Sequence, residues 1–261
     1  MVAEHPTEHR LAQWLATSRR VVALTGAGMS TESGISDYRS KGGLWERFQH
    51  VTLDEFLDSE RSREAFWAYS REFWEQLSVA QPGAGHRALR ELWRGGWLSG
   101  ILTQNIDGLH QQAGIPAEQV LELHGSSRAT VCLSCGDRRP AQEIYDRIVQ
   151  GERVPRCHRC HGLIKPTIVM FGERLDPQVL DQATRWASSC DIFVAIGSTL
   201  LVQPAASLPL VAKQAGARLV ILTRSETPLD EVADLKITGA IGGVLAEMVR
   251  VLGARRPAGS I

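Results

Sequence analysis

The sequence predicts an α/β fold built on a parallel sheet, with a smaller metal-binding segment inserted into it. Three observations lead to this prediction. Short apolar, β-branched runs alternate with segments of helical periodicity, which is the pattern of βαβ units. The first apolar run ends in a glycine-rich turn that begins at Gly26. Two CxxC pairs interrupt the alternation between the third and the fourth apolar run.

The elements follow one another in a regular order. Predicted strands are short β-branched and apolar runs, which cover residues 21–25, 98–103, 119–123, 192–196 and 219–222. Predicted helices are longer segments in which apolar residues recur at helical spacing, and they cover residues 8–17, 61–77, 86–93, 177–188, 204–215 and 243–252, with a short one over 141–150 in the cysteine segment. Helical crossovers between successive strands are what a parallel sheet requires.

Composition and charge exclude several classes of protein. The chain of 261 residues has 43% hydrophobic and 22% charged residues, which is ordinary for a globular protein and excludes a disordered one. Its longest apolar runs fall far short of the ~20 residues of a membrane span, so we expect no membrane partner. The 29 basic side chains balance the 29 acidic ones, so nucleic acid is not expected as a partner. No secretory signal opens the sequence, which predicts a cytoplasmic location.

Four cysteines are spaced as zinc ligands. Cys132 and Cys135 form one CxxC pair, and Cys157 and Cys160 form a second pair after 21 intervening residues. This spacing is close to that of known zinc sites. Because four thiolates leave no open coordination position, we expect a tetrahedral structural zinc ion and not a catalytic one. The surrounding segment, 127–165, is predicted to be an insertion that zinc stabilises.

The glycine-rich turn after the first strand is typical of a phosphate site. Gly26-Ala27-Gly28 lets the backbone approach a pyrophosphate closely, although the same pattern also occurs in ordinary tight turns. Thr31 stands where the G-x-G-x-x-G fingerprint has its third glycine, and no strand precedes Glu46, the acidic residue at the expected distance. These departures disfavour a standard dehydrogenase and leave a dinucleotide as the ligand.

Further polar clusters predict a common site. They are Asp37-Tyr38-Arg39 after the glycine turn, residues 103–107 after the second strand, and Leu123-His124-Gly125 after the third. Ligands of open α/β sheets bind beyond the carboxyl ends of the strands, so these clusters are expected to converge. Each has a simpler explanation by itself, since Asp107 could cap a helix and His124 could be an ordinary loop histidine.

These motifs carry a family resemblance. The chain resembles the sirtuins, NAD-dependent protein deacylases, in GAGMSTESGISDYRS (26–40), TQNIDGLHQQAG (103–114), ELHGS (122–126), the paired CxxC motifs, IKPTIVMFGE (164–173) and GSTLLVQPAA (197–206). The resemblance implies a Rossmann-like parallel sheet with helices on both faces plus a small zinc-ribbon module. Residues 1–126 and 166–261 would form the NAD-binding domain, and residues 127–165 the inserted zinc ribbon.

The resemblance also implies roles for individual residues. His124 would be the general base, and Asn105 and Asp107 would act beside it. NAD would be held by Gly26, Ala27, Gly28, Ser30, Asp37, Tyr38, Arg39, Gln104, Asn105, Ile106, Asp107, Gly197, Ser198, Thr199, Thr223 and Ile241. The partner would be an acylated lysine of a protein or peptide, bound by strand addition to Val169, Phe171, Gly172, Glu173, Val202 and Gln203.

The implied reaction is a deacylation, with acetyl as the principal group, that releases nicotinamide and O-acyl-ADP-ribose. The acyl oxygen attacks the ribose, so no protein nucleophile is needed, and His124 can accept a ribose proton because an imidazole titrates near pH 6.5. Two alternatives remain open: a non-catalytic sensor of NAD or ADP-ribose, and a mono-ADP-ribosyltransferase. The presence of the base favours the enzyme, because a binding protein needs none.

Three residues depart from the family pattern. Ser36 and Tyr38 stand where the family usually has Pro and Phe, and both changes are expected to be tolerated. Thr223 stands where the family commonly has an Asn facing the adenosine ribose. A hydroxyl offers fewer hydrogen bonds than an amide, so Arg224 or Ser225 would have to replace it.

The resemblance also bears on the acyl group. Trp67 and Ser70 occupy the positions of a Tyr-x-x-Arg pair that marks sirtuins acting on succinyl or malonyl lysine. Neither side chain is charged, so we expect neutral acyl groups to be preferred over acidic ones. Trp67 is expected to line an apolar tunnel, and Tyr69 and Arg71 to point away from it.

Overall fold

The computed structural model describes residues 7–36 and 50–253, and its core is a six-stranded parallel sheet. The strands are β1 (Val21–Thr25), β2 (Gly100–Thr103), β3 (Val120–Glu122), β7 (Ile192–Ile196), β8 (Arg218–Leu222) and β9 (Leu235–Ile237). They lie in the order β3-β2-β1-β7-β8-β9, and every neighbouring pair is parallel. If the six strands are numbered along the chain, this is the order 3-2-1-4-5-6 of Rossmann folds. The chain first adds strands on one side of β1 and then, from β7 on, adds them on the other side.

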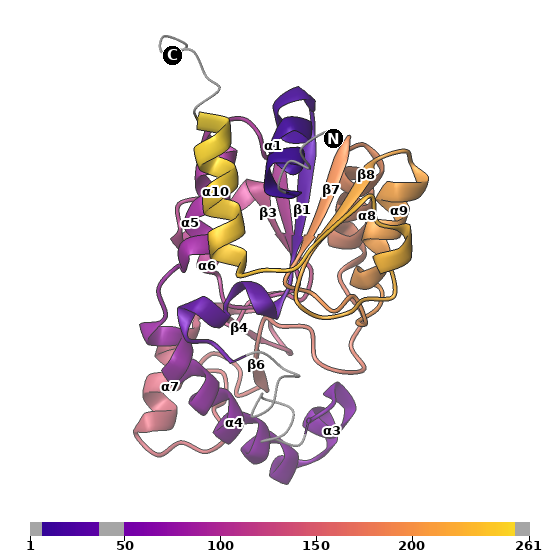
Figure 1. Cartoon of the computed structure of the whole chain (residues 1–261). Coiled ribbons are helices and arrows are strands. Elements are labelled where there is room, and N and C mark those ends of the chain that lie inside the picture. Colours follow the sequence, from indigo (N-terminus) through magenta and orange to yellow (C-terminus); the bar gives the residue numbers. More distant parts are fainter. Residues whose placement is uncertain (1–6, 37–49, 254–261) are drawn as a thin grey trace, which may run out of the picture.

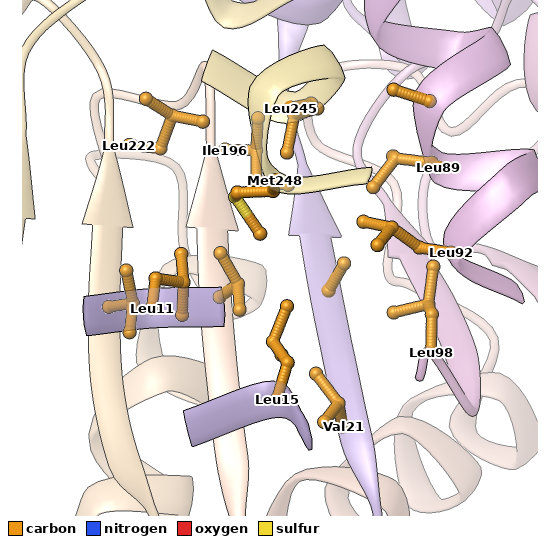
Figure 2. Close-up of a cluster of buried hydrophobic side chains, with 14 of the residues drawn as sticks. Leu11, Leu15, Val21, Leu89, Leu92, Leu98, Ile196, Leu222, Leu245 and Met248 are labelled. Atoms are coloured by element: carbon orange, nitrogen blue, oxygen red, sulfur yellow. The ribbon is translucent and has the colours of Figure 1, made fainter. Parts of the chain in front are cut away.

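Helices cover both faces of this sheet, as Figure 1 shows. One face is covered by α1 (Thr7–Thr17), α5 (Ala84–Arg94) and α10 (Ile241–Gly253), and the other by α8 (Pro177–Ser188) and α9 (Leu208–Gln214). Side chains of β1 alternate between the two cores: Val21 packs with the first set of helices and Val22 with the second. Burial on both faces explains why β1, β2 and β7 contain no charged residue and are mostly apolar. Figure 2 shows the first core, where Met248 of α10 lies between Leu11 of α1 and Leu89 of α5 over the sheet.

A second, three-stranded antiparallel sheet forms the small module in the lower part of Figure 1. Its strands are β4 (Ala129–Cys132), β5 (Arg138–Pro140) and β6 (Ile164–Pro166), in the order β5-β4-β6, with α7 (Ala141–Val149) beside them. The module shares one apolar core with α3 (Leu53–Asp58) and α4 (Glu60–Val79), which lie outside residues 127–165. Phe56 and Trp67 of these helices pack in that core with Ile144 and Tyr145 of α7.

The predicted elements of the large sheet are confirmed to within two residues at each end. The short elements were not predicted: β9, the three strands of the small sheet, α3 and α6 (Leu109–Gln112). These elements are three to six residues long, too short to display a period, and they lack the continuous apolar run that marks strands such as β1 and β7. The predicted helix over 204–215 is wrong in its first turn, which is a 3-10 turn (Ala205–Ser207) before α9. Pro209 near the start of α9 has no N–H to donate, which interrupts the helical hydrogen bonds there.

No helix within the described residues is long and apolar enough to cross a membrane.

Candidate functional site

A cavity of about 470 Å³ opens at the carboxyl ends of β1, β2, β7 and β8, on the side of the small module. It lies at the point where the strand order reverses, which is where open α/β sheets bind ligands. Most predicted site residues line it: Ala27, Gly28, Gln104, Asn105, Ile106, His124, Val169, Phe171, Gly172, Glu173, Gly197, Ser198, Thr199, Val202, Gln203 and Thr223. The convergence predicted from the strand-terminal clusters is therefore confirmed for these residues.

The remaining predicted residues lie elsewhere. Ser30 and Asp107 line a small neighbouring pocket that shares Asn105 with the cavity. The side chain of Ile241 is buried in the first core, next to Gly197. The cluster Asp37-Tyr38-Arg39 lies outside the described residues.

The glycine turn is shaped by close packing of two backbone loops. A Cβ atom on Gly26 would lie 2.8 Å from the carbonyl oxygen of Gly197, and one on Gly28 would lie 2.9 Å from the same atom. The N–H of Gly28 donates to this oxygen over 2.9 Å. Glycine is required at both positions because no larger residue allows the turns after β1 and β7 to meet.

A buried hydrogen-bond network fixes the polar side chains after β2. Asn105 donates from Nδ2 to Gly26 O and to Ser30 Oγ, each over 3.1 Å, and the hydroxyl of Ser30 donates to Asp107 Oδ2 over 2.6 Å. Asp107 Oδ1 accepts from the N–H of Leu109, the first residue of α6. Asp107 therefore caps the start of α6, as the simpler explanation of this residue predicted. It also orients Ser30, and through it Asn105, in the pocket.

His124 is held in one tautomer. Its Nδ1 lies 2.9 Å from the carbonyl oxygen of Gln104, which can only accept, so Nδ1 carries the proton and Nε2 is the basic nitrogen. Burial lowers the pKa of the His124 imidazole, and the Gln104 hydrogen bond opposes this shift in part. The side chain is thus a neutral base in the cavity wall near neutral pH.

Gln104 presents an unused donor. Its Oε1 accepts from the hydroxyl of Ser198 over 2.8 Å, whereas its Nε2 is buried and has no partner. A buried amide N–H without an acceptor is costly, so the arrangement fits a ligand with oxygen atoms, such as the ribose of a dinucleotide. At the end of β8, Thr223 and Ser225 also line the cavity, whereas Arg224 does not.

The segments predicted to bind a peptide both line the cavity. Residues 168–173 follow β6, and residues 201–203 follow the turn after β7. The first segment is anchored to the base, because the N–H of Val169 donates to the carbonyl oxygen of His124 over 2.8 Å. Gly125 makes this approach possible: its φ is +69°, and a Cβ there would overlap the carbonyl oxygen of Thr167.

Helix α4 contributes a stripe of four side chains to the cavity, of which the sequence predicted only Ser70. Phe66, Tyr69, Ser70 and Phe73 line the cavity at helical spacing. Trp67 does not line it; the ring is 1% exposed and packs edge-on against Phe66 and Tyr145. The prediction that Trp67 lines the tunnel was wrong, because this position lies ~100° around the helix from Phe66.

Tyr69 was also expected to point away, and it lines the cavity instead, where burial raises the pKa of its phenol to about 12. Arg71 does lie on the solvent side, where it pairs with Glu75 over 3.0 Å. Among the described lining residues there is no Lys or Arg.

The four cysteines of the CxxC pairs come together at one end of the small sheet. Their Sγ atoms all lie within 4.8 Å of one another, with Cys132 3.5 Å from Cys160 and Cys135 3.7 Å from Cys157. A zinc ion with bonds of about 2.3 Å to four tetrahedral sulfurs places them roughly 3.8 Å apart, so the geometry fits zinc. The predicted metal ligands are thus gathered at a single site.

The comparisons with known proteins agree with this geometry. The model of the Sir2 family matches residues 26–204. An NAD-dependent protein deacetylase of Thermodesulfovibrio yellowstonii is 41% identical over 96% of this chain and 97% of its own length. NAD-dependent protein deacetylase 2 of Streptomyces coelicolor is 46% identical over 89% of this chain and 98% of its own.

Solved structures give the same result for the fold. A structure described as "Sir2-p53 peptide-NAD+" is 34% identical, with a TM-score of 0.86 over 94% of this chain and 98% of its own. A second, from work on the mechanism and regulation of Sir2 enzymes, is 38% identical, with a TM-score of 0.86 over 96% of this chain and 99% of its own.

Proposed function

Because the chain belongs to the Sir2 family, it is an NAD-dependent protein lysine deacylase, and we propose that its reaction takes place in the cavity with His124 as the base. The observation that carries this proposal is the fixed tautomer of His124, whose Nε2 is left as a proton acceptor. Bound NAD supplies the ribose whose bond to nicotinamide is broken and the ADP-ribose that takes up the acyl group.

The residues of the chain do the rest. We assign Gln104 and Asn105 to the nicotinamide ribose, since both line the cavity and Gln104 offers an unpaired donor. Asp107 and Ser30 would receive the carboxamide in the adjoining pocket. His124 Nε2 takes a proton from the ribose hydroxyl that attacks the acyl carbon. The turns that contain Ala27 and Thr199 would hold the phosphates, and Ile241 the adenine through its backbone.

The acylated peptide would bind along Val169, Phe171, Gly172 and Glu173 on one side and along Val202 and Gln203 on the other. We propose the division of the chain into an NAD-binding domain (1–126 and 166–261) and a zinc ribbon (127–165). We also propose a cytoplasmic location, because none of the five cysteines, all of which lie in the described residues, is paired in a disulfide, as expected in a reducing compartment.

One assay tests the function. The protein is incubated with NAD and an acetyl-lysine peptide, and the products are analysed by mass spectrometry. Free lysine peptide, nicotinamide and O-acetyl-ADP-ribose in equal amounts are the expected result. Nicotinamide with ADP-ribose on protein would identify a mono-ADP-ribosyltransferase instead. Binding of NAD without any turnover would identify a sensor.

Neutral acyl groups should be removed much faster than acidic ones. The stripe of α4 in the cavity is Phe66, Tyr69, Ser70 and Phe73, so a succinyl carboxylate would lose its hydration without gaining a cationic partner. An unpaired buried charge costs several kcal/mol, so kcat/KM for acetyl-lysine should exceed that for succinyl-lysine by roughly 100-fold or more.

Comparing acetyl-, succinyl- and myristoyl-lysine versions of one peptide measures this preference. Ser70→Arg should raise the rate with succinyl-lysine, whereas Arg71→Ala on the solvent face should leave the ratio unchanged. Equal rates for succinyl and acetyl peptides in the unmodified protein would contradict the prediction.

Thr223→Asn should strengthen NAD binding. The Thr223 hydroxyl accepts from the N–H of Ser225 over 3.4 Å, so it is engaged within its own turn. An amide would add a donor toward the adenosine ribose, and the KM for NAD should fall roughly fivefold, equivalent to the ~1 kcal/mol of one net hydrogen bond. Steady-state kinetics with varied NAD measure it, with Ser225→Ala as the companion variant. An unchanged KM in Thr223→Asn together with a raised KM in Ser225→Ala would show that Ser225 already fills the role.

A further inference from the structure

A buried ammonium group lies beside the predicted peptide-binding segment. Lys165 is the middle residue of β6, where it pairs with Val131 of β4, and it is only 3% exposed. Burying a charge is costly unless partners surround it, so its contacts define what it does. Lys165 lies within the motif IKPTIVMFGE (164–173), but the resemblance implied no role for it.

The ammonium of Lys165 has three hydrogen-bond acceptors around it. Its Nζ lies 3.0 Å from Glu173 Oε2, 2.6 Å from the carbonyl oxygen of Ile168 and 3.4 Å from that of Pro166. An ammonium has three N–H donors, so all of them are used. Glu173 Oε2 also accepts from the N–H of Met170 over 2.9 Å. The chain from 166 to 173 is thereby folded around one positive charge.

The same loop is tied to the site on both sides. The N–H of Val169 donates to the carbonyl oxygen of His124, and the N–H of Leu53 donates to the carbonyl oxygen of Phe171 over 2.9 Å. The loop therefore lies between the segment of the base and the start of α3. The shape of this loop is therefore fixed by the contacts of Lys165 and Glu173 and by these two backbone hydrogen bonds.

We propose that Lys165 is a positioning residue for the protein substrate. It acts through Glu173 and the carbonyl of Ile168 to hold residues 168–173 in the form that receives the acylated peptide. This inference rests on the proposed function, in which that segment contacts the peptide. It assigns to the Glu173 side chain a task different from peptide contact: the carboxylate is the counter-ion of the loop. The NAD-binding turns after β1 and β7 do not depend on this ion pair.

The test is a split between two Michaelis constants. Lys165→Met removes the charge at similar length and leaves Glu173 unpaired, so the KM for an acetyl-lysine peptide should rise roughly tenfold or more, while the KM for NAD changes by less than about twofold. Lys165→Arg keeps the charge and should restore most of the peptide affinity. Glu173→Gln keeps an acceptor for Lys165 but removes the negative charge, so its KM for the peptide should lie between the values of Lys165→Met and Lys165→Arg. This variant also tests the inference if Lys165→Met does not fold. Lys213→Met is the control, because it breaks an ion pair of 2.6 Å between Lys213 of α9 and Asp234, neither of which lines the cavity.

A lower melting temperature with an unchanged KM for the peptide in Lys165→Met and Glu173→Gln would overturn the inference and make the pair a structural one only. A parallel rise in both Michaelis constants would do the same, since it would indicate a general disturbance of the site. If the unmodified protein neither binds nor deacetylates the peptide, the proposed function fails instead, and the two failures are thus distinguishable.

Discussion

His124→Ala should lose deacetylation by at least about 10² to 10⁴-fold while still binding NAD and the acetyl-lysine peptide, because a general base contributes a factor of this size. The hydrogen bond from Nδ1 to Gln104 O aligns the ring but does not build the cavity, whose other walls stay in place. Turnover measured by peptide mass and NAD affinity measured by calorimetry separate the two effects. His9→Ala is the control, because His9 lies on α1 and does not line the cavity.

The pH dependence of the unmodified enzyme tests the same role. Burial lowers the pKa of His124, so more than half of the imidazole is neutral at pH 6.5 and the neutral fraction rises further toward pH 7. A base must be neutral to act, so kcat/KM should stay constant around pH 7 and fall as the pH drops through a value below 6.5. Near-normal turnover in His124→Ala, or an acid limb centred above pH 6.5, would show that another group accepts the proton.

The large sheet was predictable because its strands obey a simple rule. Residues 192–196 are buried on both faces, so the segment is apolar throughout and its limits coincide with β7. The same topology brings the ends of β1, β2 and β3 to one edge, which is why the glycine turn, residues 103–107 and His124 could be expected from the sequence to converge. The strands of the small sheet follow no such rule, because β4 is buried on one face only and β5 is exposed throughout.

The contributions of side chains between elements could not be predicted in this way. Whether Trp67 or Tyr69 of α4 faces the cavity depends on the rotation of the helix, and that is fixed by packing against Tyr145 of α7, far away in the sequence. Lys165 stands in a strand between two residues that are also buried, so nothing local indicates its partner. Glu173, eight residues later, becomes that partner only because the chain turns back around the ammonium.

Removal of zinc is expected to unfold the small module and abolish activity, with one zinc ion per chain in the native protein. Cys132 and Cys157 are both 2% exposed and belong to the core that contains Phe56, Trp67 and Tyr145, so the metal site and this core are one structure. In small zinc modules the binding free energy of about 10–16 kcal/mol is also folding free energy. Without the ion, four thiols would remain beside the short pairing of β4 with β6, and the link from Cys132 and Cys135 to Cys157 and Cys160 through the metal would be lost.

Cys157→Ala tests this with Cys190→Ala as the matched control. Cys190 is buried in the second core and is not part of the cluster, so its replacement should keep the zinc and cost only ~1 kcal/mol of packing. Cys157→Ala should lose zinc in metal analysis, lower the melting temperature and weaken the near-ultraviolet circular dichroism of the aromatic core. Deacetylation should disappear as well, because β4 pairs with β6, and Lys165 of β6 donates to the loop that we propose to receive the peptide. Folded, fully active protein without zinc would refute this coupling between the metal and the substrate site.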